Sequence, residues 1–556
     1  MKRRTLITSF LSLLTTTPAG TTPQKKTTGH RTPYADRIGV ELDGLGDGAR
    51  IMPFIDLAKT LRPFTLPDSA QPAPTDNNGW PTADCQTVLF DIRPIPAWDP
   101  PIDDPEAFQP DWSGTYKLSF NGQATLTLKD PNGIQIRNQK YDPDTNRTSA
   151  DILVPPTAGI LLLAFSRTRR SPRHPENSGI TNLRVTRPGY PHNTTQTFTN
   201  EFLNALKPFR ILRYMDWLET NHNPGYYGDP GHHALHWKDR RLPTDATQVP
   251  TGNKYGVAWE YCIQLANLTD THMWINIPVA ATDDYVLQLA RMLKNNLKPQ
   301  LRIYIEHSNE VWNFGFPQYT YNKLAAIDEV RKGNSPLNND NINDEERFAH
   351  RRHAQRLIQI TRTFQNVFGT RSLLTRIRPV YASWLIQPQS HYRDVLTWVE
   401  NTYGHPGKFF YALASAAYFN AQTAPPDASP QQILQAMRQS TQESLQYHRQ
   451  IKAIADHYRI KYAQYEIGPD TGGGSTVNVA NRIRANRLPE IKDVILENAR
   501  LWFQMGGDAY IYFALAGPYS RYGCWGLSED IRNLHTPKWQ AIYQLTGYPP
   551  PPRRKP

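Results

Sequence analysis

The sequence predicts a (β/α)8 barrel, the TIM-barrel architecture, with a β-sandwich inserted between its first and second β/α units. Strand-like and helix-like runs alternate along most of the chain and form eight units, the number that closes into such a barrel. Between residues 66 and 190 this alternation gives way to short strands separated by turn residues, which is typical of a sandwich. A doubly wound open sheet is disfavoured because no Gly-rich phosphate-binding turn follows any strand.

The barrel elements follow from the apolar periodicity of each run. The eight strands are expected at residues 38–44, 210–217, 273–281, 301–307, 376–384, 408–419, 460–468 and 508–517. The helices are expected at residues 52–64, 256–268, 283–297, within 344–368, at 391–404, from Ser429 onward, at 489–505 and at 536–547. Gly369 is a typical C-terminal stop, and Ser429-Pro430 is an N-cap followed by proline at the first helical position.

Inside the expected sandwich, turn pairs such as Asn121-Gly122 separate strands of alternating polarity. These strands are expected at residues 114–120, 124–130, 151–156, 159–166 and 181–188. The resulting domains are an N-terminal tail at 1–30, the first barrel unit at 31–65, the sandwich at 66–190, the remaining barrel units at 191–548, and a Pro-rich basic tail at 549–556.

The first twenty residues, MKRRTLITSFLSLLTTTPAG, have the outline of a signal peptide: a basic start, an apolar run, then small residues. The order of the two arginines and the following apolar residues is also similar to a twin-arginine signal. We therefore expect a secreted or extracytoplasmic protein, the alternative being a disordered N-terminal tail. No later apolar stretch reaches the length of a membrane span.

Composition limits the class of protein and its partners. The 556 residues are 39% hydrophobic, which is typical of a soluble globular chain. A net charge of +12 favours anionic partners such as an acidic polysaccharide, although it can also serve solubility alone. No helix interleaves basic and aromatic residues, so no nucleic-acid partner is expected. The three cysteines are far apart, which excludes a disulfide scaffold and a cysteine zinc site.

Two carboxylates fall where a barrel places its chemistry. Active sites of these barrels lie at the C-terminal ends of the strands. The fourth strand runs into Asn309-Glu310, and the seventh ends at Glu466. Both side chains should therefore reach the same mouth. Two carboxylates facing across one bond are what glycoside hydrolysis requires.

The stretches "YIEHSNEVWN" and "YEIGPD" around these glutamates resemble the clan A glycoside hydrolases. With "LRYMDWLETN" and "ELDGL" they look more narrowly like a group of secreted barrel proteins described as cellulose-binding or glycosidase-like. The resemblance covers roughly residues 38–64 and 190–547. It implies that Glu310 is the acid/base of a retaining mechanism and Glu466 its nucleophile, with no cofactor. Alternatively, Glu310 stabilises the start of a helix and Glu466 only forms a salt bridge.

The resemblance implies further roles around this pair. Asn309 would hydrogen-bond the sugar 2-hydroxyl, Arg213 would hold the nucleophile ionised, Tyr418 would lie near that nucleophile, and Trp525 would stack on the sugar. Each of these four could instead be purely structural. One departure from the clan pattern is Ile467, where a small residue is expected. It would either crowd the site or face the barrel wall.

Other side chains at strand ends are candidates for substrate binding. Asp43 and the pair Asp216-Trp217 should line the same mouth, unless they only anchor loops. Trp312 and Trp384 could form a sugar platform or pack in the core. The three tryptophans Trp80, Trp98 and Trp112 could make the sandwich a carbohydrate-binding module, or the sandwich could simply brace the barrel.

No metal site is expected. His232, His233 and His236 cluster after the second strand, but no further ligands complete a zinc set. His350 and His353 lie on a charged helix and are interpreted as a solvated face. Gly472 to Gly474 lack the lysine and spacing of a phosphate loop and are interpreted as a rim loop.

These observations favour a retaining glycoside hydrolase that acts on a polysaccharide or oligosaccharide. The alternative from another class is a carbohydrate-binding or surface protein that keeps the barrel without hydrolysis. The two functions differ in one requirement: in a hydrolase the side chains of four residues should converge around Glu310, namely Arg213, Asn309, Tyr418 and Glu466. The sugar, the linkage, endo or exo action and the oligomeric state do not follow from the sequence.

Overall fold

The computed structural model describes residues 31–93, 102–129, 131–222, 234–250, 254–472 and 477–552. The expected signal peptide, Trp98, His232, His233, Gly473 and Gly474 lie outside these residues. No helix in the described part of the chain combines the length and apolar character needed to cross a membrane.

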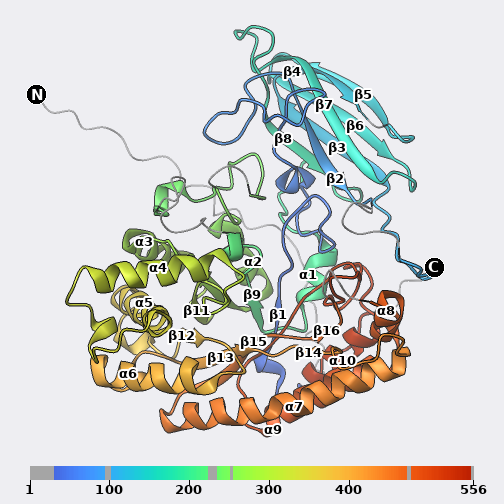
Figure 1. The fold of residues 1–556 in the computed structure, drawn as a ribbon. Coiled ribbons are helices and arrows are strands. Elements are labelled where there is room, and N and C mark those ends of the chain that lie inside the picture. The colour runs from blue at the N-terminus through green and yellow to red at the C-terminus, as the bar shows by residue number, and fades with distance from the viewer. Residues whose placement is uncertain are drawn as a thin grey trace, which may run out of the picture.

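Eight parallel strands close into a barrel, as the sequence predicts, with the cyclic order β1-β17-β15-β13-β12-β11-β10-β9 (Figure 1). The strands are β1 (Ile38–Glu41), β9 (Ile211–Arg213), β10 (His272–Ile277), β11 (Ile303–His307), β12 (Ile377–Ala382), β13 (Ala412–Ala416), β15 (Lys461–Ile467) and β17 (Tyr510–Tyr512). Seven of the eight observed strands lie inside their expected runs, and β10 begins one residue earlier, at His272. The observed strands are shorter because their ends bend into the loops of the barrel mouth.

Helices surround the barrel (Figure 1). They are α1 (Asn200–Leu206), α2 (Trp259–Thr269), α3 (Asp283–Asn296), α4 (Pro317–Arg331), α5 (Glu345–Phe368), α6 (Asp394–Tyr403), α7 (Pro430–His457), α8 (Val479–Arg487), α9 (Ile491–Gln504) and α10 (Pro537–Thr546). In α7, Ser429 and Gln432 form the capping box that satisfies the first backbone N–H groups. The sequence analysis did not predict α4, because its buried face includes Gln318 and Asn322 and its apolar period is weak.

The helix expected at residues 52–64 is absent, which changes where the inserted region lies. Only a single 3-10 turn, Leu57–Thr60, forms there. The chain leaves the barrel after β1 and makes isolated bridges from Phe54 to Phe198 and from Asp56 to Thr186. The helix of the first unit is α1, which follows the inserted region. The insertion therefore interrupts the first β/α unit, and does not fall between units one and two.

The inserted region contains two antiparallel sheets, which lie to one side of the barrel (Figure 1). One sheet has the order β2-β7-β4 and the other β5-β6-β3-β8. Their strands are β2 (Cys85–Asp91), β3 (Gly114–Asn121), β4 (Gln123–Leu128), β5 (Gln135–Asp142), β6 (Arg147–Val154), β7 (Ile160–Arg169) and β8 (Thr181–Thr186). An edge contact between Phe120 and Phe165, with ring centres 5.5 Å apart, joins the two sheets. The exposed strand β5 lacks apolar alternation, which is why the sequence did not predict it.

Two tryptophans of the inserted region are buried, as the bracing interpretation requires. Trp80 is 6% exposed and donates its indole N–H to the carbonyl of Thr244 at 3.3 Å. Trp112 is 5% exposed and packs edge-on against Phe90 at 5.3 Å. Neither side chain offers an open face to a sugar.

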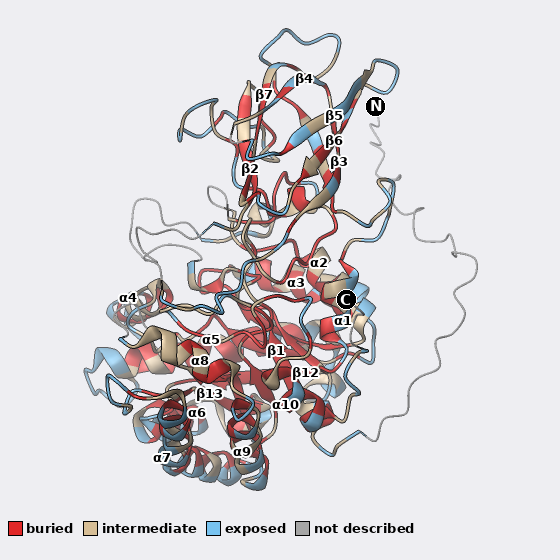
Figure 2. Cartoon of the chain, turned by 90° about the vertical axis from the view of Figure 1, so that its right-hand side faces the viewer, coloured by how far each residue is buried: buried red, intermediate tan, exposed pale blue. Residues whose placement is uncertain are grey.

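The interior of the barrel is filled by alternating large and small side chains, buried as Figure 2 shows for the strands. Its members are Ile211, Trp274, Tyr304, Val380, Ala382, Ala412, Ala414, Ala463, Tyr465, Ala509 and Ile511. Gly39 of β1 faces the same interior. A Cβ atom on Gly39 would lie 2.5 Å from Ile511 Cδ1 and 2.8 Å from the Ile211 carbonyl oxygen. A glycine is needed there because neighbouring strands leave no volume for a methyl group.

We expect Gly39→Ala to lower the free energy of unfolding by about 1–3 kcal/mol, because the added methyl group overpacks the barrel interior. Urea unfolding followed by circular dichroism measures this. Gly46→Ala is the matched control, since its Cβ would meet nothing within 4 Å. Equal stability of the two variants would contradict this account of the interior.

Candidate active site

Arg213 lies at the centre of the barrel mouth and holds four side chains from other strands. It is the last residue of β9 and is fully buried. Its Nη1 donates to Glu466 Oε1 at 2.7 Å and to Glu41 Oε2 at 3.1 Å. Its Nη2 donates to Asn309 Oδ1 at 2.7 Å and to Glu306 Oε2 at 3.1 Å. One guanidinium group therefore ties together four strand ends of the barrel.

Strand alternation explains two of these partners, which the sequence analysis missed. Ile303 and Ile305 of β11 face the helices, so Tyr304 and Glu306 face the interior. Glu306 also accepts a hydrogen bond from the Trp274 indole at 2.8 Å. Glu41 faces inward by the same rule on β1. A carboxylate at an inward position of an apolar strand was the available signal, in "ELDG" and "YIEH".

Burial raises the pKa of these inner carboxyl groups. Burial, followed by the charge of Glu466, raises the pKa of Glu41 to about 8, although Arg213 opposes the rise. Burial also raises the pKa of Glu306, again against Arg213. One guanidinium group stabilises three buried carboxylates only partly. Protonation of Glu41 therefore also lowers the negative charge of the cluster.

Glu466 reaches the mouth because β15 carries a bulge. Opposite β17 the register passes from Gln464–Tyr510 to Ile467–Tyr512, so Tyr465 and Glu466 together oppose one residue. Tyr465 lies in the barrel interior, and Glu466 turns to Arg213. Ile467 consequently faces the helix layer and does not crowd the site. The second carboxylate oxygen of Glu466 accepts a hydrogen bond from the Tyr418 hydroxyl at 2.8 Å.

Glu310 is placed by a left-handed turn after β11. Ser308 has φ 59° and Glu310 has φ 42°, values that non-glycine residues rarely adopt and that often mark functional sites. Glu310 accepts hydrogen bonds from the Tyr465 hydroxyl at 3.1 Å and from Asn313 Nδ2 at 2.8 Å. Burial, followed by the negative charge of Glu466, raises the pKa of Glu310 to about 7.

Asn309 is oriented by two amides that the sequence did not indicate. Its Oδ1 faces Arg213, and its Nδ2 donates to Asn221 Oδ1 at 2.9 Å. Gln318, at the start of α4, donates to the same Asn221 oxygen and to the Asn309 carbonyl, both at 2.8 Å. Gln318 is 1% exposed. This arrangement fixes which edge of the Asn309 amide is oxygen and which is nitrogen.

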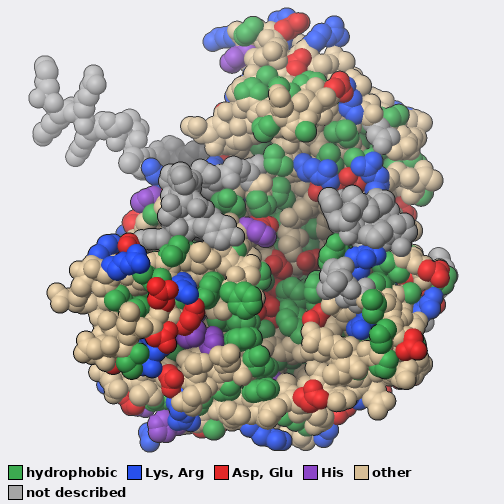
Figure 3. Space-filling model, in the orientation of Figure 1, with side chains coloured by type: hydrophobic (Ala, Val, Ile, Leu, Met, Phe, Trp, Pro, Cys, Tyr) green, Lys and Arg blue, Asp and Glu red, His purple; other side chains and the backbone are tan. Residues whose placement is uncertain are grey.

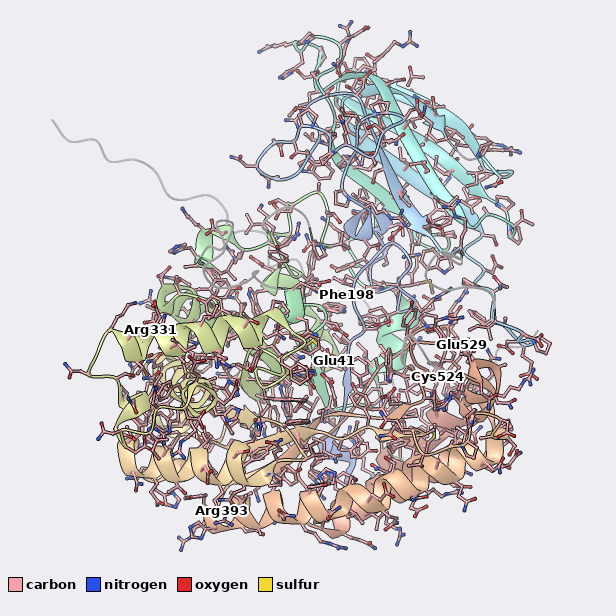
Figure 4. All side chains as sticks on the ribbon, viewed as in Figure 1. Glu41, Phe198, Arg331, Arg393, Cys524 and Glu529 are labelled. Carbon is pink, nitrogen blue, oxygen red and sulfur yellow. The ribbon has the colours of Figure 1, made fainter. Side chains whose placement is uncertain are left out.

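Asp43 and Asp216 lie beside the pair at the ends of adjacent strands, as the sequence predicts. Asp43 Oδ1 accepts a hydrogen bond from the Gly44 N–H at 2.9 Å, and burial raises the pKa of Asp43 to about 7. Burial, followed by the charges of Glu41 and Asp43, raises the pKa of Asp216 well above its usual range. Figure 3 shows acidic side chains gathered in the hollow at the middle of this face, and Figure 4 shows Glu41 at the same place.

The predicted aromatic residues divide between the mouth and the core. The ring centres of Trp525 and Phe513 lie 5.9 Å apart, and those of Phe513 and Tyr418 lie 5.8 Å apart. Because Tyr418 bonds Glu466, Trp525 belongs to the wall of the mouth beside Glu466. Trp312 and Trp384 stack with ring centres 5.4 Å apart and planes 8° apart.

Trp217 does not line the mouth, contrary to expectation. It is 1% exposed and stacks on Phe202 at 5.8 Å, next to Phe54 and Phe198. Its ring packs the inserted region's linker against α1, because the strand end turns after Asp216.

His353 corrects another expectation. It is 4% exposed and bonds His307 at 3.0 Å between the two Nδ1 atoms, so this side of α5 is not a solvated face. Within the described residues, no three His, Cys, Asp or Glu side chains gather as a metal site would require. The three cysteines are buried and unpaired.

No protein-family model matches the sequence, and no curated protein sequence does. Solved structures of glycoside hydrolases are similar in fold. A family 51 arabinofuranosidase from Xanthomonas axonopodis pv. citri is 16% identical, with 64% of this chain and 68% of that chain covered and a TM-score of 0.40. A 4-O-α-L-rhamnosyl-β-D-glucuronidase from Fusarium oxysporum is 13% identical, with 62% and 63% covered and a TM-score of 0.36.

Xylanase 10C from Cellvibrio japonicus is 9% identical, with 88% of this chain and 98% of that chain covered and a TM-score of 0.33. All three TM-scores are below 0.5. The function of this chain therefore has to be inferred from its own residues.

We expect Arg213→Met to lower the free energy of unfolding by about 3–5 kcal/mol, because it leaves buried carboxylates without their cation. The loss should be larger at about pH 8 than at about pH 5. Glutamates ionise near pH 4.3 in the unfolded chain, whereas the buried ones have a raised pKa in the folded protein. Folding stability that is present at low pH is therefore lost as the pH rises through the folded pKa. Arg213 lowers the pKa of these glutamates, so the variant without it loses more stability than the native protein.

Urea unfolding at the two pH values measures the effect. Arg376→Met is the control for loss of an arginine. In the described part of the chain this half-buried arginine donates to the backbone carbonyls of Leu297, Lys298 and Leu301 and bonds no carboxylate. A loss that does not depend on pH would contradict the assignment of the charge cluster.

Proposed function

We propose that the protein is a retaining glycoside hydrolase, with Glu466 as nucleophile and Glu310 as acid/base. One observation carries the proposal: two neighbouring carboxyl groups have different partners. Glu466 accepts hydrogen bonds from the Arg213 guanidinium group and from the Tyr418 phenol. Glu310 accepts hydrogen bonds from two neutral side chains, Asn313 and Tyr465, and burial raises its pKa to about 7, which suits a proton donor. Different surroundings of this kind separate acid from nucleophile in paired-carboxylate sites.

In the first step the Glu466 carboxylate attacks the anomeric carbon while Glu310 transfers its proton to the departing oxygen. The glycosidic bond breaks, and a covalent ester joins the sugar to Glu466. In the second step Glu310, now ionised, removes a proton from water as the water oxygen attacks the same carbon. The ester breaks, both glutamates regain their starting states, and the anomeric configuration is retained.

The surrounding residues act through these two groups. Arg213 lowers the cost of the Glu466 negative charge before attack, and the Tyr418 hydroxyl holds the second oxygen. Asn309 uses one N–H for Asn221, which leaves the other for a sugar hydroxyl. Asp43 and Asp216 can bind further hydroxyls, and Trp525 offers a stacking face. These four contacts with substrate are part of the proposal.

The substrate class is a polysaccharide or oligosaccharide, since the mouth is open and lined by carboxyl and aromatic groups. The basic N-terminal segment with its apolar run supports a secreted or extracytoplasmic location. Carboxylates alone can perform both steps, so the mechanism requires no cofactor or metal.

We expect the purified protein to release new reducing ends from at least one glycan in a panel of neutral and acidic polysaccharides. Glu466→Gln should lower the rate by about 10⁴-fold or more, because the amide cannot form the ester. Glu497→Gln, a surface glutamate on α9, is the matched control. Proton NMR of the first product anomer tests retention. Equal release by the native and Glu466→Gln proteins would contradict the assignment of the nucleophile.

The pH dependence of kcat/KM should follow Glu310. Because the acid must be protonated, activity should fall tenfold per pH unit above about pH 7. The Tyr465 hydrogen bond holds the Glu310 pKa down, so Tyr465→Phe should move this alkaline limb to higher pH. Tyr403→Phe, outside the mouth, should leave the limb in place. An alkaline limb that is the same in the Tyr465→Phe and native proteins would count against Glu310 as the acid.

A further inference from the structure

A cavity of about 400 Å³ lies at the ends of β11 and β12. Trp312, which follows Glu310 by two residues in the sequence, is part of its lining. We call it the side cavity. Its lining includes Trp312, Phe314, Tyr319, His350, Trp384 and His391. These residues come from the loops after the two strands and from the starts of α4, α5 and α6, so the cavity continues the mouth outward on the side of Glu310. None of its contacts takes part in the reaction steps given above.

The aromatic side chains of the side cavity present the kind of surface that binds a sugar ring. Trp312 and Trp384 stack nearly parallel, which fixes both rings before any ligand arrives. Phe314 beside them is 80% exposed, an unusual state for a phenylalanine. Flat, preformed aromatic faces with an apolar body suit the C–H face of a sugar.

Two histidines give the cavity polar groups without charge. His391 is 4% exposed, and its Nδ1 bonds the Ser383 hydroxyl at 2.9 Å. The ring of His350 lies 4.1 Å from that of His391. Burial lowers the pKa of both, to about 3 for His391, so both are neutral imidazoles at neutral pH. In the described part of the chain, His391 Nε2 has no protein partner and is available for a hydroxyl.

The ionised residues that line the cavity already have protein partners. Arg351 bonds the Asp340 carboxylate and the Leu337 carbonyl. Glu346 is paired with Lys323, and Asp344 caps α5 through two backbone N–H groups. Arg347 shares the Asp340 carboxylate with Arg351, and Asp394 accepts a hydrogen bond from Gln389. A charged ligand would have to compete with these partners, whereas a neutral polyol would find neutral donors, acceptors and aromatic faces.

Glu310 protonates the leaving oxygen in the proposed reaction, so the leaving group departs on its side of the mouth. We propose that the side cavity binds a neutral sugar unit of the leaving group. This inference rests on the proposed function and deepens it, because it makes the substrate a glycan that continues beyond the cleaved bond. A volume of about 400 Å³ is near the lower end of ligand cavities, which span roughly 300–1,000 Å³, and suits one or two sugar rings.

The binding test uses the full chain carrying Glu466→Gln, so that ligands are not hydrolysed. The probes are cello-, xylo-, manno- and chito-oligosaccharides of two to six units, and the readouts are tryptophan fluorescence and calorimetry. We expect at least one series to bind, and Trp384→Ala to weaken it about tenfold. Phe314→Ala, at a solvent-exposed position that is safe for folding, should weaken it by about threefold.

Trp237→Ala is the matched control, since this tryptophan packs on Tyr285 and Arg240 away from the cavity and should not change affinity. Thermal unfolding of each variant checks that it is folded. Unchanged affinity in both Trp384→Ala and Phe314→Ala would overturn the proposal. Failure of every series to bind would overturn it as well.

The kinetic test separates this proposal from the proposed hydrolysis. With the native protein, kcat/KM for an oligosaccharide should exceed that for the 4-nitrophenyl glycoside with the same non-leaving part. Trp384→Ala should raise KM for the oligosaccharide and remove that advantage. If hydrolysis occurs and the advantage persists in Trp384→Ala, the side cavity is not a leaving-group site. If no glycan is cleaved but Trp384→Ala still weakens oligosaccharide binding, only the hydrolytic function fails.

Discussion

The fold and the site of this protein both depend on how one buried cation is shared. Arg213 bonds three glutamates and an asparagine that come from β1, β11, β15 and the turn after β11. Taking the guanidinium and its partners out of water is costly, and the cost is met only while every partner stays in place. The same guanidinium group that binds the inner glutamates also binds Glu466, the proposed nucleophile. Stability and the proposed chemistry are therefore coupled at one residue.

The two carboxylates reach the mouth because the backbone departs from regular strand geometry at both strand ends. Regular alternation would place Tyr465 inside and Glu466 outside, and the bulge in β15 brings both inward. After β11, left-handed conformations at Ser308 and Glu310 turn the chain so that Glu310 reaches the hydroxyl of Tyr465. Tyr465 links the two departures, because it lies beside Glu466 within the bulge and its hydroxyl donates to Glu310. Local rules are broken where the chemistry lies, as expected for functional sites.

The sequence predicts most of the architecture, since buried parallel strands and amphipathic helices have strong periodic patterns. It also places Arg213, Asn309, Tyr418 and Glu466 near Glu310, because strand ends in a closed barrel meet at one mouth. It fails where a pattern has two structural solutions. The apolar run at 52–64 has a helical period, yet the chain needs that segment to leave the barrel, and only a 3-10 turn forms.

Tryptophan at a strand end is a second ambiguous pattern. Trp217 and Trp384 occupy similar sequence positions, but the first turns into the core and the second stays at the surface of the side cavity.

Net charge is a third ambiguous property of the sequence, because it describes the whole surface and says little about a buried site. The chain carries +12, whereas its mouth gathers carboxyl groups around a single arginine whose Nη atoms are already bonded to protein. The basic surplus therefore belongs to the rest of the surface, and it gives no information on the charge of the sugar at the cleaved bond.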